Sequence, residues 1–123
     1  MGIVRMDHIE LLARDLDETV AFYVEILGFR RGRRTISTRP DGSRVEQACV
    51  MLDDFMIELF QASSEAISSG WDRDALGVKT FALRVKDMSA TKAELERQGV
   101  VFSQEPRPGS SFEGLRGEIL DPS

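Results

Sequence analysis

Polar and apolar residues follow two different periods in the first half of the chain. Residues 3–13 alternate between polar and aliphatic side chains, which is typical of a strand with one buried face. A helical pattern follows Asp15, a predicted N-cap with Glu18 three residues later, and it closes at Gly28. Three more strand-like runs, separated by turn residues, cover 29–38, 44–52 and 55–60. The first half is therefore predicted to be β-α-β-β-β.

The second half starts the same order again. A stretch rich in Ser and Gly predicts a linker over 62–77. The alternating run 78–87 then predicts a strand, and 88–99 predicts a helix that ends at a glycine. Two further strands are predicted at 100–104 and 115–121, with a loop rich in Pro and Gly between them.

The two halves are an internal repeat. The segment "HIELLARDLDETVAFYVEILG" aligns with "TFALRVKDMSATKAELERQG". Such a repeat predicts one α+β domain over 1–123, built from two βαβββ modules related by a pseudo-two-fold axis, with a curved mixed sheet around a cleft. Module one spans 3–61 and module two spans 78–123. The last strand of module two, the counterpart of 55–60, is expected to be absent from residues 1–123.

Composition narrows the class of protein. The chain has 123 residues, 41% hydrophobic and 30% charged, as is typical of one globular domain. Its net charge of -5 argues against a nucleic-acid partner. The single cysteine, Cys49, excludes an intrachain disulfide and fits a reducing compartment. Without a signal-peptide pattern or a membrane-length apolar run, we expect a cytoplasmic protein with no membrane partner.

The only histidine, His8, is predicted to meet Glu58 on the sheet face that turns away from the helix. Side chains alternate along a strand, so His8 shares a face with Glu10. In the fourth strand Glu58 lies between Met56 and Phe60 on that face, where a carboxylate without a partner is costly to bury. An imidazole and a carboxylate on a half-buried surface suit a divalent metal of borderline character.

Structural interpretations of the same residues stay open. His8 can be a hydrogen-bonded structural histidine, Glu58 can face solvent, or the two can form a plain ion pair. Arg84 lies on the same predicted face as Thr80. Its guanidinium is expected either to pair with Glu58 or Glu10, or to hold an anionic substrate.

The repeated β-α-β-β-β module, with "DHI" in the first strand, "AFYVEILGF" in the helix and "IELF" in the fourth strand, resembles the vicinal oxygen chelate superfamily. That superfamily includes glyoxalase I, methylmalonyl-CoA epimerase, extradiol dioxygenases and bleomycin-resistance-type binding proteins. The resemblance covers nearly the whole chain. It is specific for the fold and weak for the activity, because one scaffold hosts many reactions.

The resemblance implies a set of metal ligands. Metal-using members take one ligand from the first strand and one from the last strand of each module, which correspond to His8 and Glu58 here. Thr80 stands where many relatives have a second histidine, and the fourth ligand is expected after the Asp121-Pro122 turn, beyond Ser123. The metal is expected to be Zn, Ni, Mn or Fe, or the protein uses none. One histidine disfavours an extradiol dioxygenase, which uses two.

Two main functions follow from the resemblance, and a third interpretation is a structural remnant without a ligand. The leading one is a divalent-metal-dependent lyase or isomerase acting on a small carbonyl-containing molecule, with Glu58 as the catalytic carboxylate. The alternative is a metal-free protein that binds and sequesters a small molecule, and either form is expected to be a homodimer. The residues expected to contact the ligand are Gln47, Met56, Phe60, Thr80, Arg84 and Glu118.

Overall fold

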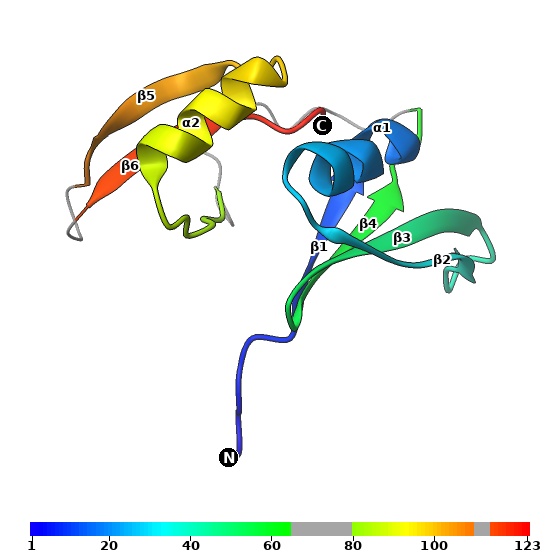
Figure 1. Cartoon of the computed structure of the whole chain (residues 1–123). Helices are drawn as coiled ribbons and strands as arrows, with labels where there is room; N and C mark the ends of the chain where they lie inside the picture. The colour runs from blue at the N-terminus through cyan, green and yellow to red at the C-terminus, as the bar shows by residue number, and fades with distance from the viewer. Residues whose placement is uncertain (65–79, 110–113) are drawn as a thin grey trace, which may run out of the picture. The chain divides into compact units, whose positions relative to one another are not determined.

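The computed structural model describes residues 1–64, 80–109 and 114–123 (Figure 1). The chain divides into two compact units, one formed by Met1–Ala66 with Asp121–Ser123 and the other by Ile67–Leu120. Most of the predicted linker, 62–77, lies outside the described residues.

The first unit has the predicted β-α-β-β-β order. Its elements are β1 (His8–Ala13), α1 (Leu16–Ala21) continuing as the π-helical turn η1 (Phe22–Ile26), β2 (Arg30–Thr38), β3 (Arg44–Leu52) and β4 (Phe55–Gln61). The strands form one sheet in the order β1-β4-β3-β2. β1 pairs with β4 in parallel, whereas the other two pairings are antiparallel. The first and fourth strands of the sequence are therefore neighbours in space.

The helix covers one face of this sheet and forms the core with it. Asp15 caps α1 by accepting a hydrogen bond from the backbone N–H of Glu18 at 3.0 Å. The buried aliphatic side chains of β4 are Ile57 and Leu59, both fully excluded from solvent. Burial of that kind stabilises by about 1.5–3 kcal/mol per side chain. Because strand side chains alternate, the residues between them point to the opposite face.

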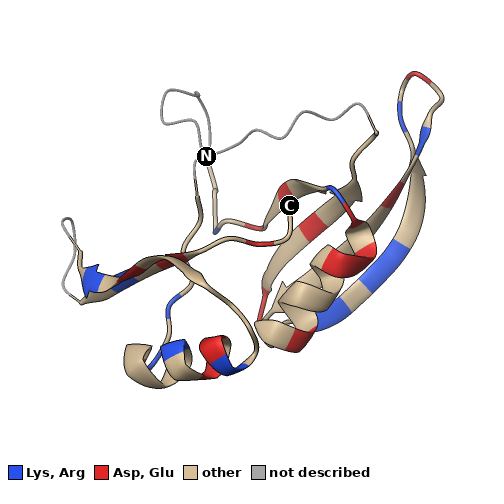
Figure 2. Ribbon diagram, turned by 90° about the horizontal axis from the view of Figure 1, so that it is seen from above, with Lys and Arg blue, Asp and Glu red and all other residues tan. Residues whose placement is uncertain are grey.

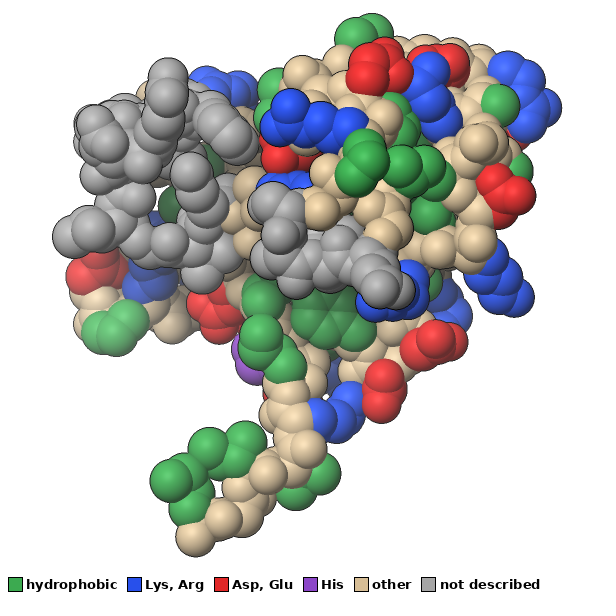
Figure 3. Space-filling view, turned by 90° about the vertical axis from the view of Figure 1, so that its left-hand side faces the viewer, with side chains coloured by type: hydrophobic (Ala, Val, Ile, Leu, Met, Phe, Trp, Pro, Cys, Tyr) green, Lys and Arg blue, Asp and Glu red, His purple; other side chains and the backbone are tan. Residues whose placement is uncertain are grey.

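β1 is shorter than the predicted strand. Pairing with β4 begins at His8, opposite Met56, and residues 1–7 have no strand assignment. The backbone before Asp7 lacks a partner on β4, because β4 starts at Phe55, one residue before the partner of His8. The side chains of Ile3, Val4 and Met6 are exposed along this apolar arm, which extends away from the rest of the first unit (Figures 1 and 3).

Basic residues gather on the edge strand β2, opposite acidic residues of α1 (Figure 2). Arg34 donates to Asp17 of α1 at 2.5 Å and to Glu46 of β3 at 2.9 Å. Exposed pairs of this kind contribute little stability, typically about 0–1 kcal/mol. These two contacts neutralise Arg34 within the basic run.

The second unit contains α2 (Met88–Arg97), β5 (Phe102–Pro108) and β6 (Leu115–Ile119), with β5 and β6 in an antiparallel pair. Asp87 caps α2 by accepting from the N–H of Ala90 at 2.9 Å, which repeats the cap at Asp15. The equivalent caps support the internal repeat seen in the sequence. β5 is longer than predicted because β6 pairs with it as far as Pro108.

The strand predicted at 78–87 is not formed by its described residues, 80–87. In the first unit, the corresponding strand β1 takes its ladder hydrogen bonds from β4. The described part of the second unit has no counterpart of β4, so the backbone of 80–87 lacks a pairing strand. The apolar side chains of Phe81, Leu83 and Val85 remain more than one third exposed as a result.

The C-terminal residues pack on the helix of the first unit. The Tyr23 hydroxyl donates to Oδ2 of Asp121 at 2.8 Å, and Thr19 Oγ1 lies 3.0 Å from Ser123 Oγ. Tyr23 is only 2% exposed, and its ring meets Phe29 edge-on. Burial, reinforced by the Asp121 carboxylate, raises the pKa of Tyr23, so the hydroxyl stays a proton donor.

Tyr23→Phe is expected to lower the free energy of unfolding by about 1–3 kcal/mol, because it removes a buried hydrogen bond to a charged acceptor while keeping the ring packing. Urea denaturation measures the change. In a double-mutant cycle with Asp121→Ala, the two losses should not add, since each variant breaks the same bond. Fully additive losses would show that Tyr23 and Asp121 act independently.

Candidate functional site

The parallel pairing of β1 with β4 brings three metal-ligating side chains together on the face away from α1. Glu10 lies directly opposite Glu58, and His8 lies opposite Met56. The His8 Nε2 atom is 3.8 Å from Glu10 Oε1 and 3.8 Å from Glu58 Oε2. One ligand atom from each residue falls within 4.8 Å of the others. We call His8, Glu10 and Glu58 the β1–β4 cluster.

The β1–β4 cluster has the charge and donor atoms that suit a cation. Two carboxylates directly opposite each other on neighbouring strands repel, and Glu58 is only 21% exposed, which limits its solvation. Either an imidazolium at His8 or a bound metal ion relieves this repulsion. One nitrogen and two carboxylate oxygens are a suitable donor set for Zn, Mn, Fe or Ni. Since metal–ligand bonds measure about 2.0–2.2 Å, modest side-chain rotations would close the cluster around an ion.

Asp7 fixes the orientation of the His8 ring. Its Oδ2 atom lies 2.8 Å from His8 Nδ1, so Nδ1 donates to Asp7 and Nε2 faces the two glutamates. Metal-binding histidines commonly have their second nitrogen held by a carboxylate in this way. The same hydrogen bond raises the pKa of His8 and lowers the pKa of Asp7; Glu58 and Glu10 add smaller upward contributions to that of His8.

Sequence reasoning did not identify Asp7 and Glu10 as partners of a metal site. The signal for Glu10 was present, because it lies two residues after His8 and therefore on the same strand face. No such signal exists for Asp7, since strict alternation would turn it to the helix side. Asp7 precedes the first residue of β1, where the chain is not held in the pleat.

Three predicted ligand-contact residues share the sheet face of the β1–β4 cluster. Met56 and Phe60 flank Glu58 on β4, and Gln47 of β3 pairs with Phe60. All three are half-buried. Cys49 lies opposite Glu58 on this face, and burial raises the pKa of its thiol. Apolar and weakly polar side chains therefore surround the cluster on this face.

The remaining predicted contact residues belong to the second unit. Thr80 and Arg84 lie in the exposed segment without strand structure. Glu118 is on β6 and accepts a hydrogen bond from Arg116 at 2.9 Å. Their role as ligand contacts stays a prediction.

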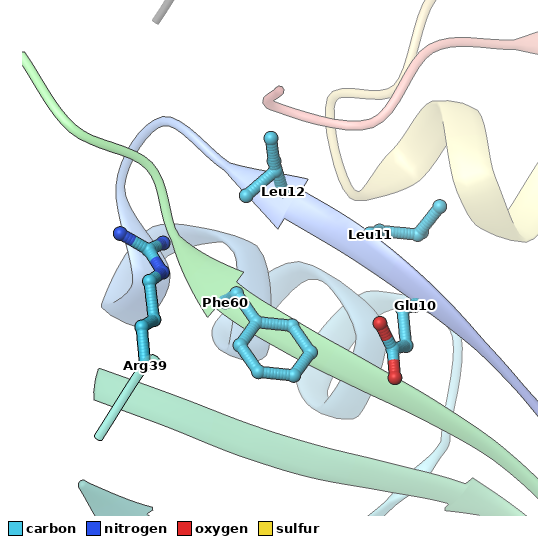
Figure 4. Close-up of a pocket in the computed structure, with 5 residues that line it drawn as sticks. All are labelled: Glu10, Leu11, Leu12, Arg39 and Phe60. Atoms are coloured by element: carbon cyan, nitrogen blue, oxygen red, sulfur yellow. The ribbon is translucent and has the colours of Figure 1, made fainter. Parts of the chain in front are cut away.

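A hollow of about 300 Å³ adjoins the β1–β4 cluster (Figure 4). It shares Glu10 with the cluster, and its other lining residues are Leu11, Leu12, Arg39 and Phe60. A larger hollow of about 520 Å³ lies over β2 and β3, but the Arg34–Glu46 ion pair lines it and no cluster residue does. The smaller hollow is therefore the better candidate for a ligand.

Comparison with known proteins supports this fold. Residues 7–116 match the family model of the Glyoxalase/Bleomycin resistance protein/Dioxygenase superfamily. Comparison with the curated proteins found no significant match. No helix within the described residues has the length and apolar character needed to cross a bilayer.

Several solved structures have the same fold. The crystal structure of SMU.1112c is 27% identical, with a TM-score of 0.79 over 98% of this chain and 93% of that one. A glyoxalase family protein from Enterococcus faecalis is 24% identical, with a TM-score of 0.81 over 96% and 90% of the two chains. TnmS3, an antibiotic binding protein from Streptomyces sp. CB03234, is 21% identical, with a TM-score of 0.68 over 99% and 90%. The predicted mixed α+β fold is confirmed.

The single histidine makes the Asp7–His8 contact directly measurable. An NMR titration of the imidazole is expected to give a pKa above the ordinary 6.5, and Asp7→Asn should lower it because the hydrogen bond is its main cause. Since the folded-state pKa is raised, His8 protonation stabilises the fold below the unfolded-state pKa, and that contribution is lost as pH rises through the folded-state pKa.

Asp17→Asn is the matched control, since Asp17 lies on α1, across the sheet from the histidine. It should leave the His8 titration unchanged. An equal pKa in the wild type and in Asp7→Asn would contradict the assigned role of Asp7.

Proposed function

Because the chain belongs to the glyoxalase/bleomycin resistance protein/dioxygenase superfamily, also called the vicinal oxygen chelate superfamily, we propose that it is a divalent-metal-dependent lyase or isomerase acting on a small carbonyl-containing molecule. One observation carries this proposal: His8, Glu10 and Glu58 converge within 4.8 Å beside a ligand-sized hollow. Zn, Ni, Mn and Fe are the metals that this donor set fits.

The chain's own residues have separate roles in this proposal. A bound divalent metal supplies Lewis-acid polarisation of the substrate carbonyl, which acidifies the neighbouring C–H group. His8 and Glu10 hold the metal together with Glu58. Glu58 is also the catalytic carboxylate, because its side chain is 21% exposed whereas that of Glu10 is 63% exposed. A carboxylate sheltered from water is the better placed of the two to exchange a proton with a bound substrate.

The proposal also covers the ligand-contact residues of the second unit, the oligomeric state and the cellular location. Thr80, Arg84 and Glu118 remain proposed ligand-contact residues. We also propose that the protein forms a homodimer, to which the exposed apolar arm before His8 would contribute buried surface. A single cysteine and a net charge of -5 support a cytoplasmic protein without a nucleic-acid partner.

The second candidate function is metal-free sequestration of a small molecule. The observation in its favour is the half-buried Phe60 and Met56 surface, together with the description of the similar TnmS3 as an antibiotic binding protein. In this case the His8 imidazolium balances Glu10 and Glu58, and the apolar surface holds the ligand. The enzyme function requires a bound divalent metal ion, whereas the sequestration function requires none.

Adding Zn, Ni, Mn or Fe to chelator-treated protein is expected to raise the melting temperature for at least one metal. At a hundredfold excess over Kd, a ligand that binds only the native state adds about 2.7 kcal/mol, which shifts Tm by about 5 °C or more. His8→Ala and Glu58→Gln should abolish the shift, and Glu10→Gln should reduce it. Glu25→Gln, with the same charge change on the exposed η1 surface, should keep it.

No shift with any of the four metals would contradict the metal-dependent function and favour sequestration. If metal binds, NMR in D₂O follows deuterium uptake beside the carbonyl in a panel of small ketones and aldehydes. Metal-dependent uptake is expected of the enzyme, and Glu58→Gln should lose it together with metal binding. Metal binding without uptake on any of these compounds would argue against proton transfer.

A further inference from the structure

We propose that the hollow beside the β1–β4 cluster recognises a small molecule that carries an oxyanion group, a carboxylate or a phosphate, on an apolar body. Arg39 is the residue that binds the anion, and Phe60 and Leu12 contact the apolar body. This inference extends the proposed function by naming its substrate class. The part of it that concerns Arg39 does not require a metal.

The position of Arg39 is set by the tight turn between β2 and β3. The Arg39 N–H donates to the Ser43 carbonyl at 2.8 Å, and the Gly42 N–H donates to the Arg39 carbonyl at 2.9 Å. Gly42 has a φ of +85°, which glycine adopts without strain. Asp41 closes the turn by accepting from the N–H of Ser43 at 2.9 Å. The backbone that carries the guanidinium is therefore fixed before any ligand arrives.

The Arg39 guanidinium forms no ion pair within 4.0 Å among residues 1–64, 80–109 and 114–123; its nearest acidic influence is Asp41 of the same turn, whose pKa is lowered by hydrogen bonds from Ser43 and, to a smaller extent, by Arg39. In the same unit, Arg5 pairs with Asp54, Arg31 with Glu25, and Arg34 with Asp17 and Glu46. Arg39 instead lines the hollow (Figure 4). A guanidinium presents a rigid fork of N–H donors that matches the two oxygens of a carboxylate or phosphate.

The middle of the hollow is apolar. Figure 4 shows the Phe60 ring between Arg39 and Glu10, with Leu12 on the neighbouring strand. Leu12 is 61% exposed, and Phe60 is half-buried. An apolar ligand body that covers both side chains removes this surface from water, which is favourable in proportion to the area covered.

Charge decides which way the ligand lies. Among the residues that line the hollow, Arg39 carries the positive charge and Glu10 a negative one, so the oxyanion group belongs at Arg39. A carbonyl oxygen, which is uncharged, then lies at the end of the hollow that the β1–β4 cluster shares. The hollow of about 300 Å³ is at the lower limit of ligand pockets, which favours a small molecule.

The test uses three small probes that each carry a phenyl ring: 3-phenylpropanoate, phenyl phosphate and the neutral 3-phenylpropanamide. Binding is measured by chemical-shift titration with chelator present, so that a failure of the metal hypothesis does not affect the result. Wild-type protein should bind at least one anionic probe more tightly than the amide, and the tighter of the two identifies the anionic group. Arg39→Gln should weaken that anionic probe about tenfold and leave the amide unchanged.

Two further variants separate charge from packing. Phe60→Leu should weaken the anionic probe and the amide alike, because it removes apolar contact. Arg44→Gln, which removes the same charge from an exposed position that does not line the hollow, should change neither. Each variant must keep the wild-type thermal unfolding transition.

Two results would overturn the proposal: equal binding of the anionic probes and the amide to wild-type protein, or an Arg44→Gln effect as large as that of Arg39→Gln. If the wild-type protein bound none of the four metals but still bound the anionic probe through Arg39, only the proposed enzyme function would be overturned.

Discussion

The parallel pairing of β1 with β4 is the constraint on which the candidate site depends. Its register places Glu10 opposite Glu58 and carries His8 Nε2 to 3.8 Å from both carboxylates. Two facing carboxylates on adjacent strands are unfavourable unless a cation lies between them. The sheet therefore favours positive charge at one point, and the His8 imidazole beside Asp7 can supply it.

The same strands build the core and the site on opposite faces. Alternation sends Ile57 and Leu59 of β4 under α1, where they are fully buried, and turns Glu58 and Phe60 to the other side. The position of Glu58 is thus held by its apolar neighbours in sequence rather than by polar contacts alone. This division explains how one fold hosts many chemistries. The side chains under the helix stabilise the fold, and those on the opposite face can differ without disturbing that core.

The described part of the second unit has no strand pairing equivalent to that of β1 with β4. Its repeat carries the N-cap at Asp87 and the helix α2, as local sequence directs, yet residues 80–87 form no strand. A strand is stable only when its backbone groups find a neighbouring strand, and the described part of this unit offers none. By contrast, Asp121 finds a buried partner in Tyr23, so the last residues are fixed by a specific contact on the first unit.

Sequence by itself determined the element order of the first unit, the cap at Asp15, the two faces of β4 and the superfamily. These features are encoded by near neighbours: periodicity, capping side chains and turn residues act over a few positions. Only the tertiary structure decided that Glu10 faces Glu58, that Asp7 holds His8 and that Arg39 lines the hollow beside Phe60. Each depends on strand register or on the path of a turn, and therefore on contacts between residues far apart in the chain, which local patterns do not specify.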